Sequence, residues 1–228
     1  MNIMLIKKDP RAIIAHAILT CGAMKVSIDK PFMWASGYNM PVYIDNRALI
    51  GYPKVRKAIA KALATQIKKA GHMYAGIAGV ATGAIPHATT LADKLRLPLL
   101  YIRPKPKDHG IGKQVEGDIP GGITSKKILV VEDTVSTGGS SARAVEAIRQ
   151  EGAIANELVC IYYHDLPGTE NVFEKMNPVC SLTPLITFQY LVERARAEHI
   201  FDEATLTELE SWHKDPFNWY TKRADAQK

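Results

Sequence analysis

The sequence predicts an α/β fold in which a central, mostly parallel sheet is flanked by helices. Three short apolar runs, residues 73–80, 97–102 and 128–131, carry the strand signal, and residues 157–163 form a fourth that alternates less regularly. Helical patterns separate or follow these runs, at residues 53–70, 86–95 and 140–151. Apolar strands that alternate with helices are typical of βαβ units, whose parallel strands are buried on both faces.

The first expected helix begins near Pro10. Residues 7–24 superficially resemble a signal peptide, because basic residues precede an apolar stretch that ends in small residues. However, His16 interrupts this stretch, and Asp9 followed by Pro10 is a favourable N-cap and first helical position. We therefore expect an amphipathic helix here, in a cytoplasmic protein.

Both ends of the chain lie outside the predicted sheet. The first fifty residues are expected to form a small lid, and the tail after Ser181 a helical addition with Asp202 as an N-cap. No internal repeat or low-complexity linker divides the sequence. We expect residues 1–228 to form a single domain with a core of roughly residues 53–180.

Composition and charge narrow the classes of partner. Hydrophobic residues make up 46% and charged residues 23%, an ordinary globular balance that argues against intrinsic disorder. Lys and Arg number 29 against 23 Asp and Glu, and the net charge is +6. The basic residues are spread along the chain, so charge alone favours polyanionic metabolites about as well as RNA. No apolar run approaches the ~20 residues needed to span a bilayer.

Cysteines and histidines give no metal signal. The three cysteines lie far apart, which excludes a disulfide scaffold or zinc knuckle and indicates a reducing compartment. The histidines outside the loop described below lack metal-ligand spacing. We expect them to be surface residues or core residues with satisfied hydrogen bonds: His16, His72, His87, His164, His199 and His213.

The strongest functional signal is EDTVSTGGSS at residues 132–141. Glu132 and Asp133 would lie at the carboxyl end of a buried strand, where open α/β sheets bind ligands. Residues 134–140 are small or carry hydroxyl groups and lead into a helix N-terminus, so they can wrap a phosphate. Two acids beside a phosphate cradle suit a sugar phosphate. An N-capping turn with incidental acids is the plainer alternative, which ten consecutive residues of this kind disfavour.

Other phosphate-binding patterns are not met. The sequence contains no GxxxxGK[ST], and its Gly-Gly is not GxGxxG, which disfavours P-loop and dinucleotide-binding folds. A second functional segment is the charged, glycine-rich loop at residues 104–122, PKPKDHGIGKQVEGDIPGG. Loops of this length inside a compact domain are usually functional or mobile. Its Lys105, Lys107 and His109 could also be ordinary solvated charges.

These segments together resemble one enzyme family. Residues 128–140, ILVVEDTVSTGGS, look like the phosphoribosyl pyrophosphate (PRPP) motif of type I phosphoribosyltransferases. Four more segments are similar to motifs of the orotate phosphoribosyltransferases, in that family's order: FMWASGYNMPVYIDNR (32–47), GVATGAIPHA (79–88), YIRPKPKDHGIGKQVEG (101–117) and WHKDPFNW (212–219). By these motifs the chain is identified as a member of that family.

The resemblance implies the type I phosphoribosyltransferase fold, with a small N-terminal hood of roughly residues 1–50 and a C-terminal helical extension. It implies transfer of the 5-phosphoribosyl group from PRPP to orotate, which gives orotidine 5′-monophosphate and pyrophosphate in pyrimidine biosynthesis. Mg²⁺ is the implied cofactor. The implied assembly is a homodimer whose catalytic loop reaches the neighbouring subunit. Neither a membrane nor a nucleic acid is an expected partner.

The resemblance also assigns residues. Glu132 and Asp133 would hold the ribose hydroxyls, directly or through Mg²⁺ carried mainly by PRPP, and no residue is assigned firmly as a metal ligand. Residues that would bind the 5′-phosphate are Thr134, Val135, Ser136, Thr137, Gly138, Gly139 and Ser140, of which Ser136 would also touch orotate.

The pyrophosphate would be bound by three cations, Arg103, Lys107 and His109. Fixed cations aimed at a leaving pyrophosphate lower the barrier, and loop closure excludes water from the reacting carbon. The catalytic residues implied are Lys107, His109 and Asp133.

Three positions depart from the family pattern. Asn39 stands where the hood usually has a lysine, Pro104 where some members have a second basic residue, and IYYHDLPG where an aromatic Phe-x-Tyr stretch is common. These changes would affect contacts to the base and the rate more than the PRPP site. The resemblance further predicts a non-proline cis peptide bond within residues 80–83.

Two other functions stay open from sequence. A phosphoribosyltransferase for another base, a purine or uracil, would keep the fold and PRPP. A PRPP-sensing, RNA-binding regulator on the same fold is the alternative from another class, and the net charge of +6 permits it. The hood segment favours orotate, and the intact loop favours an enzyme.

Overall fold

A computed structural model describes residues 9–34, 36–106 and 113–226. Within these residues the central sheet has six strands in the order β10-β9-β8-β5-β6-β7, and only β7 at the edge is antiparallel to its neighbour. The expectation of a mostly parallel α/β sheet is confirmed. The strands are β5 (Gly76–Val80), β6 (Leu99–Ile102), β7 (Val115–Glu116), β8 (Ile128–Val135), β9 (Glu157–Tyr163) and β10 (Ser181–Thr187).

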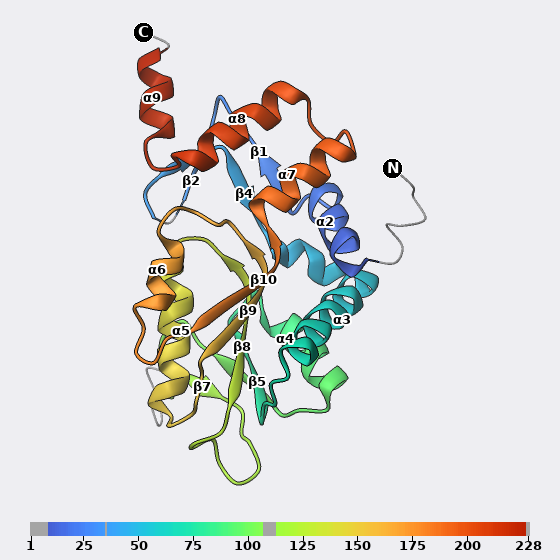
Figure 1. Ribbon diagram of the computed structural model, residues 1–228, viewed down its shortest axis with the longest axis vertical. Helices are drawn as coiled ribbons and strands as arrows, with labels where there is room; N and C mark the ends of the chain where they lie inside the picture. Colours follow the sequence, from blue (N-terminus) through green and yellow to red (C-terminus); the bar gives the residue numbers. More distant parts are fainter. Residues whose placement is uncertain (1–8, 35, 107–112, 227–228) are drawn as a thin grey trace.

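Helices cover both faces of this sheet (Figure 1). On one side lie α2 (Pro10–Thr20), α3 (Pro53–Ala70) and α4 (Ile85–Leu95), and on the other α5 (Gly139–Gln150) and α6 (Thr169–Glu174). The first core lies between the sheet and α2, α3 and α4, and it contains Leu129 and Val131 of β8. The second core lies between the sheet and α5 and α6, and it contains Ile128 and Val130. All four side chains are essentially inaccessible to solvent. Burial on both faces explains why this strand is a continuous apolar run.

Two strand predictions need correction. Strand β8 runs to Val135, so Glu132 and Asp133 lie within it, because Glu132, Thr134 and Val135 continue the ladder with β9. The sheet also extends past residue 180, where we expected the core to end, since β10 pairs in parallel with β9. This edge strand was missed because Pro184 and exposed polar residues interrupt its apolar pattern, and prolines in sheets are largely confined to edges.

Helix α2 begins as expected but is not amphipathic. The Asp9 carboxylate accepts a hydrogen bond from the backbone N–H of Arg11 at 2.9 Å, and Pro10 occupies the first turn. Most of the helix is buried against α3 and α7, at Ala12, Ile14, Ala15, Ala17, Ile18 and Leu19. Within the described part of the chain, no helix is long and apolar enough to cross a membrane.

In the described part of the N-terminal hood, two short antiparallel pairs and a 3-10 helix follow α2. Strand β1 (Met24–Val26) pairs with β4 (Val42–Ile44), and β2 (Phe32–Met33) pairs with β3 (Asn39–Met40). The 3-10 helix η1 (Asn46–Gly51) then leads into α3.

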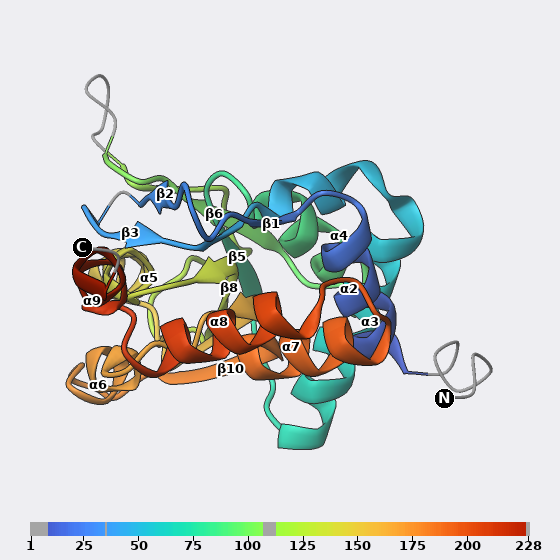
Figure 2. The ribbon, with the colours of Figure 1, turned by 90° about the horizontal axis from the view of Figure 1, so that it is seen from above.

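The C-terminal helices lie at the same end of the molecule as the hood (Figure 2). They are α7 (Phe188–Ala197), α8 (Glu203–Lys214) and α9 (Trp219–Ala226). Asp202 caps α8 as predicted, because its carboxylate accepts from the N–H of Thr205 at 2.7 Å. Trp212 is completely buried, and its Nε1–H donates to Sδ of Met40 at 3.1 Å. This contact joins the C-terminal extension to the hood.

Candidate functional site

Two cavities meet above the carboxyl ends of the central strands. The larger measures about 560 Å³ and the smaller about 270 Å³. Thr134, Ser140 and Arg143 line both of them. The segment from β8 to α5 therefore forms the boundary between the two cavities.

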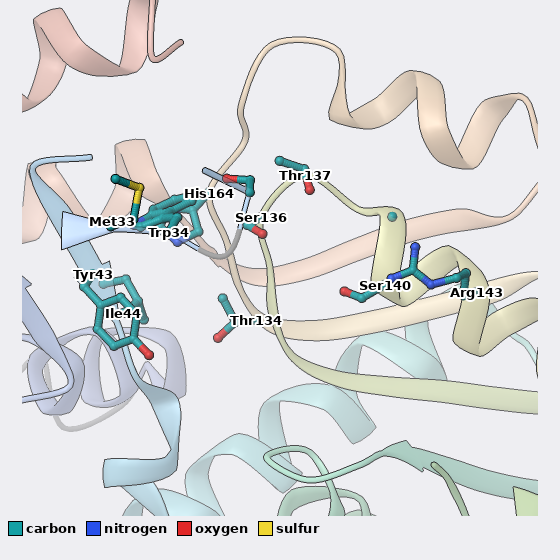
Figure 3. A pocket seen from close by; sticks show the side chains of 12 residues that line it. Met33, Trp34, Tyr43, Ile44, Thr134, Ser136, Thr137, Ser140, Arg143 and His164 are labelled. Atoms are coloured by element: carbon teal, nitrogen blue, oxygen red, sulfur yellow. The ribbon is translucent and has the colours of Figure 1, made fainter. Parts of the chain in front are cut away.

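Residues 134–140 are named the phosphate loop here for their proposed role, and five of them line the larger cavity: Thr134, Ser136, Thr137, Gly139 and Ser140 (Figure 3). Gly138 has φ of 80°, and a Cβ there would lie 3.0 Å from Cε2 of Phe173 and 3.2 Å from Cγ2 of Thr169. The Thr169 hydroxyl donates to the carbonyl oxygen of Ser136 at 3.0 Å. Helix α6 thus packs closely behind the loop and holds it in place, and only glycine fits this turn without strain.

An acid pair faces the smaller cavity. Glu132 is 6% exposed; its carboxylate accepts from the backbone N–H of Asp133 at 3.0 Å and from Oγ of Ser141 at 3.2 Å. Burial, and next the neighbouring Asp133 carboxylate, raise the pKa of Glu132 well above its ordinary value. Asp133 is the more accessible of the two acids. It is therefore the better placed to meet a ligand.

The loop after β5 packs against Asp133. A Cβ on Gly83 would lie 2.2 Å from Oδ2 of Asp133, so only a glycine leaves room for this carboxylate. The Ala81–Thr82 peptide bond in the same loop is cis, as predicted. From the hood, Asn46 Nδ2 donates to the carbonyl oxygen of Asp133 at 2.9 Å and to Oγ1 of Thr134 at 3.0 Å. Two segments distant in sequence thus hold Asp133 in place.

The far side of the smaller cavity carries the root of the long loop. Arg103 and Pro104 line the cavity together with Gln114. The backbone N–H of Arg103 donates to the Gln114 carbonyl at 2.9 Å, and Nε2 of Gln114 donates to the Arg103 carbonyl at 2.9 Å. Nη1 of Arg103 is 3.6 Å from Oε1 of Glu116. Lys107 and His109, the other two predicted cations, lie outside the described residues.

The larger cavity is closed on its other side by the base wall: Met33, Trp34, Tyr43, Ile44 and His164. His164 is 2% exposed; its ring centroid lies 4.6 Å from that of Trp34 and 4.7 Å from that of Tyr162. Burial, and next the charge of His213, lower the pKa of His164 to about 3. The ring is therefore neutral at physiological pH, a polar group in an aromatic wall.

Most of the predicted site residues lie at these cavities. Lining one or both are Arg103, Glu132, Asp133, Thr134, Ser136, Thr137, Gly139 and Ser140. Val135 and Gly138 do not line either, because the Val135 side chain is in the second core and Gly138 packs against α6. Of the positions that depart from the family pattern, Pro104 and His164 lie at a cavity, whereas Asn39 does not line either.

Sequence reasoning missed three polar residues of the site: Asn46, Arg143 and His164. His164 is a buried core residue with a hydrogen-bond partner, as expected, because its Nδ1 lies 3.4 Å from the Tyr162 hydroxyl; it also borders the larger cavity, which was not expected. His87 corrects the expectation of a satisfied core residue, because it is fully buried and neither ring nitrogen has a hydrogen-bond partner among the described residues. The departure from Phe-x-Tyr at residues 162–164 was the one available signal for His164. Groups of three or more metal-binding side chains do not occur in the described regions.

Comparison with known proteins places the chain in a family. Residues 50–174 match the family model of the phosphoribosyl transferase domain. An orotate phosphoribosyltransferase of Enterococcus faecalis is 43% identical over 207 residues, which are 90% of this chain and 96% of that protein.

Two solved structures have the same fold. The orotate phosphoribosyltransferase of Aeropyrum pernix superposes with a TM-score of 0.68 at 28% identity, over 81% of this chain and 98% of that one. The UMP synthase of Leishmania donovani reaches a TM-score of 0.76 at 20% identity, over 92% of this chain and 43% of that one. The domain match and the identity to the bacterial relative lead to one conclusion: the chain belongs to the phosphoribosyltransferases and, among them, to the orotate phosphoribosyltransferase family.

Proposed function

We propose that this protein transfers the 5-phosphoribosyl group of PRPP to orotate. The observation that carries the proposal is the meeting of the two cavities at residues 132–140. A phosphate loop, an acid pair and an aromatic pocket there adjoin one another, as the three parts of a nucleotide require. In the reaction a bond forms between N1 of orotate and C1 of the ribose while the bond from C1 to pyrophosphate breaks.

Each part of the site has a distinct task. The hydroxyls and N–H groups of the phosphate loop bind the 5′-phosphate at the positive end of α5. Asp133 and Glu132 bind the ribose hydroxyls. The base wall takes the flat orotate ring between its aromatic side chains, with Ser136 below it. Binding both reactants side by side supplies much of the rate increase.

Arg103, Lys107 and His109 would bind the pyrophosphate. Negative charge develops on this leaving group, so cations held in position stabilise the transition state more than the ground state. Arg103 stands at the smaller cavity, at the root of the loop that carries the other two. The enzyme therefore needs the loop to close for each turnover.

Mg²⁺ fits this site as a companion of PRPP. The described residues offer no cluster of three metal ligands, so the chain alone does not complete a coordination shell. The acid pair in the smaller cavity could supply one or two oxygen ligands, the donor type that Mg²⁺ prefers. When bound, the ion would neutralise charge on the pyrophosphate.

The test is a panel of bases. Purified protein is incubated with PRPP and Mg²⁺ and with orotate, uracil, adenine or hypoxanthine, and pyrophosphate release is followed. Pyrophosphate should appear with orotate and be weak or absent with the other bases. Turnover with a purine alone would reassign the substrate, and PRPP binding without turnover of any base would favour a regulator.

We further propose a homodimer in which the loop of one subunit completes the site of its partner. The length of the loop at residues 104–122 and its glycines support this arrangement, together with the family likeness.

The three cysteines are free thiols, which suits a cytoplasmic compartment.

Complementation tests the shared site. Lys107→Ala and Asp133→Asn homodimers should each be nearly inactive. After subunits exchange, about half of the dimers are mixed and each has one intact site, so activity should recover to about a quarter of wild type. A mixture that stays inactive after confirmed exchange would show that the loop serves its own chain.

A further inference from the structure

Arg143 stands where the two cavities meet. It lies in the second turn of α5, is exposed, and lines both cavities together with Thr134 and Ser140. Figure 3 shows its guanidinium on the side of Ser140, directed back toward the phosphate loop. Neither the acid pair nor the base wall accounts for a cation at this point.

The guanidinium has no carboxylate partner among the described residues. Glu146, one turn further along α5, would be the natural partner, but its carboxylate is bound by Nη1 of Arg149 at 2.7 Å. Nη1 of Arg143 instead lies 3.6 Å from the position that a Cβ on Gly139 would take. The side chain thus crosses the first turn of the helix toward its N-terminus.

A cation in this place is unfavourable for the helix itself. The N-terminus of a helix carries partial positive charge, so a like charge within the first turns is unfavourable. The first turn of α5 holds no acidic residue that would offset it. An anion bound at the phosphate loop makes this arrangement favourable, because it is attracted by both the guanidinium and the helix N-terminus.

We propose that Arg143 binds the 5′-phosphate of the phosphoribosyl group, together with the N–H and hydroxyl groups of the phosphate loop. The inference rests on the proposed function. Arg143 shares the larger cavity with Ser136, Thr137 and Gly139, and its guanidinium extends over Gly139. The pyrophosphate side of the smaller cavity has its own cation in Arg103.

This role has a kinetic signature. The 5′-phosphate does not change bonding in the reaction, so a contact to it contributes equally to substrate and transition state. Loss of such uniform binding raises KM and leaves kcat nearly unchanged. A cation at the leaving group would instead affect kcat.

Binding of ribose 5-phosphate is the direct test, because this compound carries the 5′-phosphate and no pyrophosphate. Calorimetry compares the wild type with Arg143→Gln and Arg143→Lys. A hydrogen bond to a charged group contributes about 1.5–3 kcal/mol, so Arg143→Gln should weaken binding about 10- to 100-fold. Arg143→Lys should recover part of the loss. Lys61→Ala, an exposed charge on α3 that lines neither cavity, should bind as wild type does.

Stability separates ligand binding from a structural role. The Tm of unliganded Arg143→Gln should equal or slightly exceed that of wild type, since the unfavourable cation is gone. The rise in Tm on adding ribose 5-phosphate should shrink. The KM for PRPP should rise in step with the Kd for ribose 5-phosphate, with kcat within about twofold of wild type.

Three outcomes would overturn this inference and leave the proposed function standing. Arg143→Gln could bind ribose 5-phosphate as tightly as wild type, or its unliganded Tm could fall while the ligand-induced rise stays the same. A loss confined to inorganic pyrophosphate would assign Arg143 to the smaller cavity instead. If the wild type neither binds ribose 5-phosphate nor releases pyrophosphate with any base, the proposed function itself fails, and this inference with it.

Discussion

The phosphate loop and the base wall border the same cavity but are built in different ways. The phosphate loop is a single run, residues 134–140, that includes the end of β8 and the first residues of α5 and is held in place by α6. The base wall combines hood residues such as Trp34 with His164, which follows β9. Trp212 packs behind it, with its ring centroid 6.2 Å from Trp34 and 6.3 Å from His164. A local motif therefore determines the proposed phosphate site, whereas the proposed base site depends on the packing of three distant segments.

The largest effect is expected at Asp133, which directly precedes the phosphate loop in the sequence. Asp133→Asn keeps the shape of the side chain but removes the charge that would hold the ribose hydroxyls. Turnover should fall by about 10²–10⁴-fold, the range typical for loss of a positioned acid or base. Steady-state kinetics measures the loss, and circular dichroism checks that the fold is intact. A fully active variant would remove Asp133 from the site.

Gly83→Ala tests how Asp133 is held by a segment outside the motif. The new Cβ would lie 2.2 Å from Oδ2 of Asp133, so the carboxylate must move. A displacement of about 1 Å at a reacting centre can cost about 10²-fold in rate. Gly51→Ala is the matched control, because nothing lies within 4 Å of its new Cβ. Equal activity of the two variants would show that the position of Asp133 is not critical.

The sequence predicted what is local and missed what is assembled. Helix α3 follows from helical periodicity, strand β9 from its short apolar run, and the phosphate loop from one continuous motif. Strand β10 was missed because it lies at an edge and contains Pro184, so its alternation is weak. Asn46, Arg143 and His164 stand alone among ordinary neighbours. Their roles arise only when the hood, α5 and the end of β9 come together, which no spacing in the sequence records.

A smaller effect is expected in the base wall. His164→Phe keeps an aromatic ring beside Trp34 but removes the ring nitrogens. A neutral hydrogen bond contributes about 0.5–1.5 kcal/mol, so the KM for orotate should rise up to about 10-fold. The Kd for ribose 5-phosphate should stay unchanged, because the phosphate loop is built independently. Equal losses of affinity for orotate and for ribose 5-phosphate would mean that the base wall and the phosphate loop do not act independently.

The pH dependence of orotate binding tests whether the His164 ring stays neutral in the base wall. Because the pKa of His164 is lowered to about 3, its ring keeps one charge state throughout the neutral range. Between pH 5 and 8, the affinity for orotate should therefore depend on pH in the same way in wild type and in His164→Phe. Calorimetric titration of both proteins across this range makes the comparison. A step lost with the imidazole would mean that the ring becomes charged.

The smallest effect on activity, and the clearest effect on stability, is expected at His87, which belongs neither to the base wall nor to the phosphate loop. It lies on α4, four residues after Gly83 in the sequence. Burial, and next the charge of Arg56, lower its pKa to about 4 from the ordinary 6.5. Between these values the unfolded chain binds the extra proton and the folded chain does not. The free energy of unfolding therefore falls as the pH drops below about 6.5, by up to about 1.4 kcal/mol per unit for each such histidine.

Urea unfolding at pH 7.5 and pH 5 tests this with His87→Leu. Neither ring nitrogen of His87 has a hydrogen-bond partner among the described residues, so a leucine of similar volume removes no hydrogen bond made by the ring to these residues. The free energy of unfolding of His87→Leu should therefore be near that of wild type at pH 7.5. At pH 5 the variant should be the more stable by about 2 kcal/mol, because one source of acid destabilisation is gone. His199→Asn is the control: His199 is exposed and has φ of 54°, a conformation that asparagine tolerates, so this variant should lose as much stability as wild type. If His87→Leu loses stability on acidification as steeply as wild type does, His87 is protonated in the folded protein. Its buried positive charge must then be stabilised by other groups in the core next to α4.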